Sequence, residues 1–361
     1  MKKKVKLSAS RISTVKKCSW VYYCKYILKL PDTSNDGASR GWICHLIFEC
    51  LGNPRHKKTY NKIIKSGDIF SCPAIERLMR FHAKKLNVND EENIELMKDM
   101  TLRGLRYDFF GTDNGKPTLS ISEEKFDLAI DEDGKRYNIL GFIDKLFLYK
   151  RKKQAIIRDF KTSKQVFKGS EITDNMQNLM YCLAVKHLYP EYLKRQTEFL
   201  FLKFEVARDL LGHPSKGIVE MEELTEDELE GFEYQLTEIQ KYLESFGKEE
   251  ASSNFAATQG YPSDGTFGGP LVCGKDGFKI SRGEPLLDKN GDPIKAYICP
   301  FRKSFEYYAL LDEDGDVVKT SFIDEKDKLK KKKGYSIEKR TYDGCPHWTT
   351  SKKFLDDEFT L

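Results

Sequence analysis

Two apolar stretches near the middle of the chain carry charged side chains where core residues are expected. "NILGFIDKLFLY" contains Asp144, and "AIIRDFKTSK" contains Asp159 followed two residues later by Lys161. Both stretches predict β-strands, and a basic turn between them predicts a hairpin. Side chains alternate between the two faces of a strand, so Asp159 and Lys161 share a face and Phe160 points the opposite way. Hairpin pairing would then bring the two aspartates together.

Buried carboxylates repel each other unless a cation lies between them. Two carboxylates and a backbone carbonyl form a hard oxygen site suited to Mg²⁺ or Mn²⁺. A lysine beside such an ion can orient or activate a water molecule, or stabilise negative charge that develops on a phosphate. From these residues alone, the alternative is a salt-bridged Asp159–Lys161 pair at a strand edge.

The elements around these residues follow from periodicity and turn signals. Helices are predicted over residues 11–30, 42–51, 74–107, 173–188 and 224–246, and strands over 118–131, 136–149, 154–162 and 197–205. This order favours an α/β fold in which a sheet carries the aspartates and helices flank it. After residue 250 the chain becomes rich in glycine, proline and serine. We therefore expect a core over residues 1–250 and a separate segment over 251–361.

The order of the motifs resembles the PD-(D/E)XK nucleases. "GFID", a hairpin and "DFKTSK" resemble motifs II and III of that superfamily, most closely in the branch that contains RecB-type, AddB-type and Cas4-type nuclease domains. "GWICH" matches the G-x-x-x-H of this branch with Gly41 and His45, and "QNLMY" matches its Q-x-x-x-Y with Gln177 and Tyr181. "LSASRISTVKKCSWVYYCKYILKLP" is similar to its N-terminal signature. The resemblance implies a restriction-endonuclease-like core, with a central mixed sheet flanked by helices.

The same resemblance implies roles for individual residues. The metal ligands would be His45, Asp144, Asp159 and the carbonyl of Phe160. Lys161 would be the catalytic lysine. Gln177 and Tyr181, which lie one helical turn apart, would contact the DNA backbone or steady the site. Glu123 matches an acidic position that often precedes motif II.

By resemblance, the chain is expected to be a metal-dependent deoxyribonuclease. It would be an exonuclease that hydrolyses single-stranded DNA or DNA ends, without sequence preference, during recombination, repair or replication. A Cas4-like or structure-specific nuclease is an alternative that shares every motif, and a non-catalytic DNA-binding subunit that retains the fold is another. The sequence contains no G-x-x-x-x-G-K-[ST] motif, so no P-loop motor is expected. The chain would act alone or with a helicase or recombination partner.

Cysteines add a second metal hypothesis. Cys18 lies where AddB-like and Cas4-like nucleases place the first ligand of a [4Fe–4S] cluster, and Cys273, Cys299 and Cys345 follow the core. The wide spacing of the last three leaves Zn²⁺ open, with Cys24 or His347 as substitute ligands. On one continuous helix, Cys18 and Cys24 would point to different sides and could not easily share an ion.

Composition agrees with an intracellular nucleic-acid enzyme. The chain has 361 residues, a net charge of +5 and 32% charged residues, with lysine-rich runs that could hold a phosphate backbone. No signal peptide or long apolar span is evident, so a cytoplasmic protein with mostly reduced thiols is expected. Its lysine content and size would fit a phage or a bacterium of low GC content.

Overall fold

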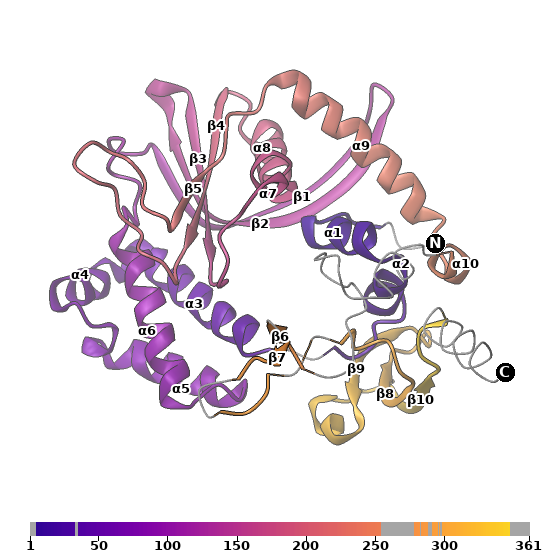
Figure 1. The fold of residues 1–361 in the computed structure, drawn as a ribbon. Helices are drawn as coiled ribbons and strands as arrows, with labels where there is room; N and C mark the ends of the chain where they lie inside the picture. The colour runs from indigo at the N-terminus through magenta and orange to yellow at the C-terminus, as the bar shows by residue number, and fades with distance from the viewer. Residues whose placement is uncertain are drawn as a thin grey trace. The chain divides into compact units, whose positions relative to one another are not determined.

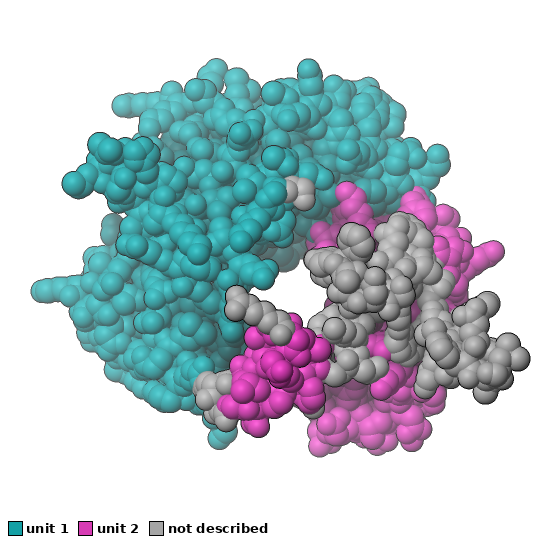
Figure 2. Space-filling model, in the orientation of Figure 1, with its two compact units in different colours: residues 1–9, 34–241 teal, residues 10–33, 242–361 magenta. Residues whose placement is uncertain are grey.

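The structure, a computed structural model, describes residues 5–32, 35–253, 278–281, 283–287, 291–294, 296 and 298–346. The chain forms two compact units, which Figure 2 colours separately. The first comprises residues 1–9 and 34–241, and the second comprises residues 10–33 and 242–361. The division at residue 250 that the sequence predicts stays a prediction. None of the helices within the described ranges is both long and apolar enough to cross a membrane.

The first unit is built on a five-stranded mixed sheet in the order β1-β2-β3-β4-β5 (Figure 1). Its strands are β1 (Leu119–Glu132), β2 (Lys135–Tyr149), β3 (Gln154–Lys161), β4 (Lys194–Phe201) and β5 (Ile218–Glu220). β3 and β4 are parallel, and the other neighbouring pairs are antiparallel. The predicted α/β fold with a central mixed sheet flanked by helices is therefore confirmed.

Helices cover both faces of this sheet (Figure 1). On one side lie α3 (Asp36–Gly52), α4 (Lys57–Ser66), α5 (Pro73–Lys85) and α6 (Glu91–Arg106). Their apolar side chains form one cluster with Phe160 of β3 and Leu200 of β4. On the other side lie the short α7 (Ser170–Thr173) and α8 (Met176–Leu188), and α9 (Glu226–Glu244) follows β5.

Strand β3 carries the chemistry because its alternate residues face different layers. Phe160 is buried against the α3 side, where its ring stacks on Phe48 with 4.2 Å between centroids. Asp159 faces α8, where it accepts a hydrogen bond from the Tyr181 hydroxyl. Lys145 of β2 pairs with Arg158 of β3, so the same antiparallel register places Asp144 across from Asp159. The expected strand faces and the approach of the two aspartates are thus both observed.

The second unit contains segments from both ends of the chain. It includes α1 (Ala9–Lys17), α2 (Ser19–Tyr22), a π-helical turn (Tyr23–Ile27) and α10 (Lys248–Ser252). A three-stranded antiparallel sheet follows in the order β10-β8-β9, formed by β8 (Phe305–Leu311), β9 (Val317–Phe322) and β10 (Ser336–Tyr342). A two-residue pair, β6 (Ile280–Ser281) and β7 (Glu284–Pro285), precedes it.

The single helix predicted over residues 11–30 is wrong. Cys18 has an extended backbone, with φ −161° and ψ 111°, and separates α1 from α2. The helix then widens into the π-helical turn at Tyr23. Its side chains explain the break, since Trp20 and Tyr22 are both buried. Tertiary packing of these aromatic residues overrides the local helical pattern.

Candidate active site

Five elements bring the candidate catalytic residues together in the first unit. β1 contributes Glu123, and β2 contributes Asp144. β3 contributes Asp159, Phe160 and Lys161 in succession. Helix α3 contributes His45, and α8 contributes Gln177 and Tyr181. Every core residue that the sequence singled out therefore lies in one neighbourhood, at the carboxyl end of β3.

His45 links α3 to both central strands. Its Nδ1 lies 3.2 Å from Asp144 Oδ1, and its Nε2 lies 3.0 Å from the carbonyl oxygen of Phe160. Both neighbours are acceptors, which favours a proton on each ring nitrogen. Burial lowers the pKa of His45, but the carboxylates of Asp144, Asp159 and Glu123 together outweigh this effect and raise the pKa to about 9. The same nitrogen and oxygen atoms can instead face a cation when one is bound.

Three side chains offer ligand atoms to a single ion. In the described part of the chain, His45, Glu123 and Asp144 are the one group of three or more histidine, cysteine or acidic residues whose ligand atoms all lie within 4.8 Å of one another. Burial and then the Asp144 charge raise the pKa of Glu123 to about 7. Carboxylate oxygens crowded in this way are stable together only if a proton or a cation neutralises them. These residues therefore fit a divalent ion.

Glu123 has an uncommon backbone conformation. Its φ of 53° lies in the left-handed region, which non-glycine residues seldom adopt. The β1–β2 ladder pairs Ser122 with Lys145 and Glu124 with Ile143 but omits Glu123. Strain of this kind collects at functional sites, where the surrounding structure maintains it.

Asp159 is held by a network from its own strand and from α8. Its Oδ2 lies 2.6 Å from Lys161 Nζ, and its Oδ1 accepts hydrogen bonds from the Tyr181 hydroxyl at 2.8 Å and from Gln177 Nε2 at 3.3 Å. Lys161 also donates to Gln177 Oε1 at 2.6 Å. Burial raises the pKa of Asp159, and Lys161 opposes that effect. Asp159 is thus paired with the lysine and lies outside the group of three ligands formed by His45, Glu123 and Asp144.

For two residues near this site the sequence predicts no role. The resemblance singles out Glu123 as an acidic position before motif II but gives it no function, and the structure places it beside Asp144. Trp42 lies within "GWICH", three residues before His45 on the same helix. Helical spacing is the signal that could indicate Trp42, whereas Glu123 is indicated by the resemblance and not by its local pattern.

Cysteines in the second unit lie close together. Cys24 is fully buried, and its thiol lies 3.5 Å from the hydroxyl of Tyr342. Burial raises the pKa of Cys24 to about 12, and the thiols of Cys299, Cys345 and Cys18 add to the increase. The expected divergence of Cys18 and Cys24 assumed one continuous helix, and the structure breaks that helix at Cys18. Cys273 and His347 lie outside the described residues.

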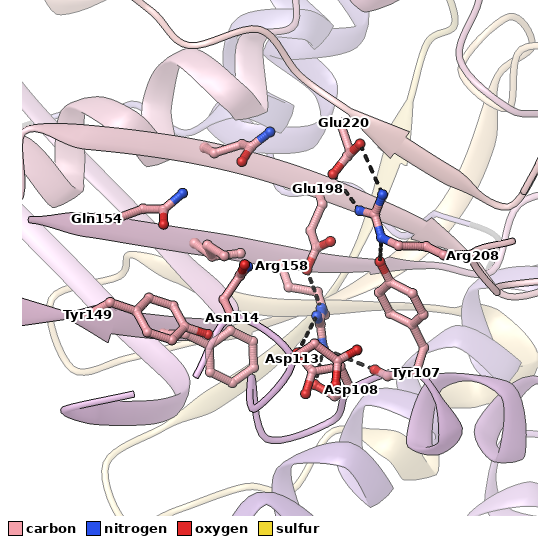
Figure 3. A pocket seen from close by; sticks show the side chains of 13 residues that line it. Tyr107, Asp108, Asp113, Asn114, Tyr149, Gln154, Arg158, Glu198, Arg208 and Glu220 are labelled. Carbon is pink, nitrogen blue, oxygen red and sulfur yellow. Dashed lines mark hydrogen bonds and ion pairs between the residues drawn. The ribbon is translucent and has the colours of Figure 1, made fainter. Parts of the chain in front are cut away.

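A cavity of about 400 Å³ lies in the first unit, on the face of β3 that carries Arg158 (Figure 3). Arg158 is buried, and its Nε donates to Glu198 at 2.6 Å. Arg208 pairs with Glu220 and donates to the Tyr107 hydroxyl at 2.9 Å. Each of these two arginines therefore meets a carboxylate.

A mixed sheet that presents two aspartates and a lysine beside a histidine is the architecture of a metal-dependent nuclease. The chain belongs to the PD-(D/E)XK nuclease superfamily, which its sequence matches over residues 6–262. Membership implies nuclease activity, a divalent metal ion and a DNA substrate. No curated protein matches the sequence significantly. A solved structure titled "Crystal structure of SSO0001" matches 64% of this chain and 87% of its own at 14% identity, with a TM-score of 0.24 that carries no argument.

Proposed function

We propose that this nuclease is an exonuclease that hydrolyses single-stranded DNA or DNA ends, with catalysis at the site around Asp144, Asp159 and Lys161. The observation that carries the catalytic part is the convergence of the His45, Glu123 and Asp144 ligand atoms beside the Asp159–Lys161 pair. The exonuclease assignment is supported by the resemblance to RecB-type and AddB-type domains. A Cas4-like or structure-specific nuclease fits the same residues.

In the proposed mechanism, His45, Asp144 and Glu123 would hold a Mg²⁺ or Mn²⁺ ion, with the Phe160 carbonyl and Asp159 close by. When bound, such an ion stabilises charge on the phosphate and lowers the pKa of a coordinated water. Lys161, 2.6 Å from Asp159, directs its ammonium group toward developing negative charge.

In this mechanism, side chains of helix α8 position Asp159 and Lys161. Tyr181 and Gln177 both donate to Asp159 Oδ1, and Gln177 also accepts from Lys161. A single helix thus fixes both the carboxylate and the lysine, and it favours the ionised form of Asp159. A non-catalytic DNA-binding subunit would have no need to keep this network intact.

Basic side chains support binding of the DNA backbone next to the site. A Cβ at Gly41 would lie 2.7 Å from the Thr162 hydroxyl, so α3 packs closely against the segment that follows β3. Lys164 lies on that segment, and Arg40 adjoins Gly41 on the helix. Burial, followed by the charges of Arg40 and Lys164, lowers the pKa of Lys203. Three cations this close together favour an anionic ligand, and the phosphates of DNA supply one.

The test of the catalytic proposal is incubation of the purified protein with end-labelled single-stranded and double-stranded DNA, with Mg²⁺, Mn²⁺ or EDTA. We expect metal-dependent release of mononucleotides or short products from one end, faster on single strands. Products cut only internally would replace the exonuclease by a structure-specific enzyme. DNA binding without cleavage under any metal condition would favour the non-catalytic subunit.

We further propose that Cys18, Cys24, Cys299 and Cys345 bind a [4Fe–4S] cluster, with Cys24 in the place first expected for Cys273. All four thiols are buried, and burial together with the charges of the other three raises the pKa of Cys24, so metal binding would stabilise its thiolate. Tetrahedral zinc with Zn–S bonds of about 2.3 Å would need sulfur atoms about 3.8 Å apart. Among the residues in view, no three cysteine sulfurs lie within 4.8 Å of one another, which favours the larger cluster.

Anaerobic purification tests this proposal through colour and metal content. We expect brown protein with about four irons per chain, and loss of iron in both Cys18→Ser and Cys24→Ser. Cys72→Ser is the matched control, since Cys72 lies in the first unit. Colourless protein with one zinc would replace iron by zinc, and full iron content in Cys24→Ser would return Cys273 to the ligand set. A cytoplasmic location, a phage source and a helicase or recombination partner stay predictions from the sequence.

A further inference from the structure

An open cavity of about 460 Å³ adjoins the candidate metal ligands. It is lined by Gly41, Trp42, His45, Leu46, Glu49 and Glu123. Two of the three proposed ligands, His45 and Glu123, therefore form part of its wall. Any group that enters this cavity therefore lies next to two of the proposed metal ligands.

Trp42 is the large apolar side chain at this cavity. It lies three residues before His45 on α3, so the two side chains are neighbours on the helix surface. Half of its surface, 50%, is exposed. Its ring meets the His82 ring of α5 edge-on at 5.0 Å, and His82 contacts Phe81, which is itself 65% exposed. An aromatic row thus leads away from the cavity along α5.

The charges around Trp42 limit what can enter. Glu49 and Glu123 line the cavity, so a second phosphate group would meet two carboxylates there. An uncharged, flat ring with amino or imino donors meets no such repulsion and can use the indole face. A nucleobase has this chemistry, and aromatic stacking accepts any of the four bases.

We propose that Trp42 forms a nucleobase subsite, in which an unpaired base of the substrate stacks on the indole beside the metal site. This inference rests on the proposed nuclease function and adds a physical basis for preferring single strands. Bases inside a duplex already stack on their neighbours, so presenting one to Trp42 requires unpairing it first. A single strand or a frayed end presents the base without that requirement.

The test compares Trp42→Ala and Trp42→Phe with the wild type on a labelled oligothymidine. Base stacking on an aromatic side chain predicts binding about 5- to 150-fold weaker in Trp42→Ala. Trp42→Phe should keep most of the affinity. In cleavage, KM for single strands should rise by a similar factor while kcat changes little. Tyr234→Ala is the control, because Tyr234 of α9 is equally exposed at 48% and does not line the cavity.

Oligonucleotides with one abasic nucleotide at successive positions separate stacking from a structural role of Trp42. At one position the missing base should weaken wild-type binding, and the same change should have no effect in Trp42→Ala. This measurement is made in EDTA, so it does not depend on cleavage. Identical abasic profiles for wild type and Trp42→Ala would overturn the subsite while leaving nuclease activity intact. Wild-type protein that cleaves no DNA would instead remove the function on which the subsite rests.

Discussion

Arg158 and Asp159 are consecutive residues of β3, yet their charged side chains lie in very different surroundings. Arg158 points toward the cavity of Figure 3, where Glu198 and the backbone carbonyls of Tyr107 and Asp108 accept its hydrogen bonds. Asp159 points toward α8, into a site that also contains the Asp144 carboxylate and Glu123. On one face of the strand the arginine meets carboxylate and carbonyl partners, and on the other face carboxylates accumulate.

The difference shows how to tell a structural charge cluster from a functional one in the same sheet. Around Arg158, the guanidinium meets Glu198, Asp108 and two backbone carbonyls, so the charge of the arginine is balanced within the protein. Around Asp144, burial and neighbouring carboxylates raise the pKa of Glu123, and His45 and Lys161 offset part of this negative charge. A site with unbalanced charge needs a ligand, whereas a balanced one needs only its own partners.

The largest expected effect is on catalysis. Asp144→Asn removes one charge from the unbalanced cluster with almost no change in shape. We expect DNA cleavage to fall by at least about 100- to 1,000-fold, since the group that would hold the ion and stabilise charge is lost. Glu198→Gln, the same change in the balanced cluster, should leave the cleavage rate of the folded enzyme within about twofold. Equal losses of activity in both variants, measured in single-turnover assays, would contradict the comparison.

The next largest expected effect is on stability, and here the larger loss is expected in the Arg158 cluster. Arg158→Met leaves the buried Glu198 without its partner, which costs about 3–5 kcal/mol of unfolding free energy. Denaturant titration in EDTA measures this loss. Arg208→Met is the control, because the Arg208–Glu220 pair is one-third exposed and its loss should cost about 1 kcal/mol or less. If Arg158→Met proved as stable as Arg208→Met, the cavity of Figure 3 would not be a structural cluster.

Stabilisation by a metal ion should depend on the carboxylate cluster around Asp144 and not on the cluster around Arg158. An ion that binds only the folded protein stabilises it by about 2.7 kcal/mol at one hundred times its dissociation constant. Added Mn²⁺ should therefore raise the melting temperature of the wild type and of Arg208→Met, but not that of Asp144→Asn. A melting temperature that Mn²⁺ raises equally in all three proteins would mean that the ion binds somewhere else.

The sequence predicted the strands of this site well, for a local reason. In β2 and β3, apolar alternation and the basic turn determine the hairpin register, and register alone places Asp144 opposite Asp159. His45 precedes these strands in the chain, and Gln177 and Tyr181 follow them. This order matches the motifs of the family that the chain resembles, which is how the three residues were predicted to lie at the site. Both the hairpin register and the motif spacing depend on residues within one element or in adjacent elements.

Other features depend on contacts that no spacing encodes. The break at Cys18 follows from buried aromatic residues, which also bring Cys24 toward Cys299 and Cys345 from the far end of the chain. The role of Trp42 depends on which side of α3 remains uncovered once α5 has packed. Local patterns predict elements, whereas long-range packing decides which of their side chains meet.

The smallest expected effect concerns Glu123, where charge and backbone strain act together. Both its φ of 53° and its proximity to Asp144 destabilise the metal-free protein. Glu123→Gly removes both effects. We therefore expect the free energy of unfolding in metal-free buffer to rise by about 1 kcal/mol, after the entropic cost of glycine is subtracted. Lys153→Gly is the matched control, because Lys153 has a similar φ of 48° in an exposed turn and no carboxylate cluster around it.

The excess of the Glu123→Gly gain over the Lys153→Gly gain therefore measures the combined cost of burying the Glu123 carboxylate and of its repulsion by Asp144. With saturating Mn²⁺ the wild type should become more stable than Glu123→Gly, because the wild type binds the ion more tightly. Equal gains in both glycine variants, unchanged by Mn²⁺, would reduce Glu123 to a strained turn residue and leave Asp144 and His45 without their third ligand.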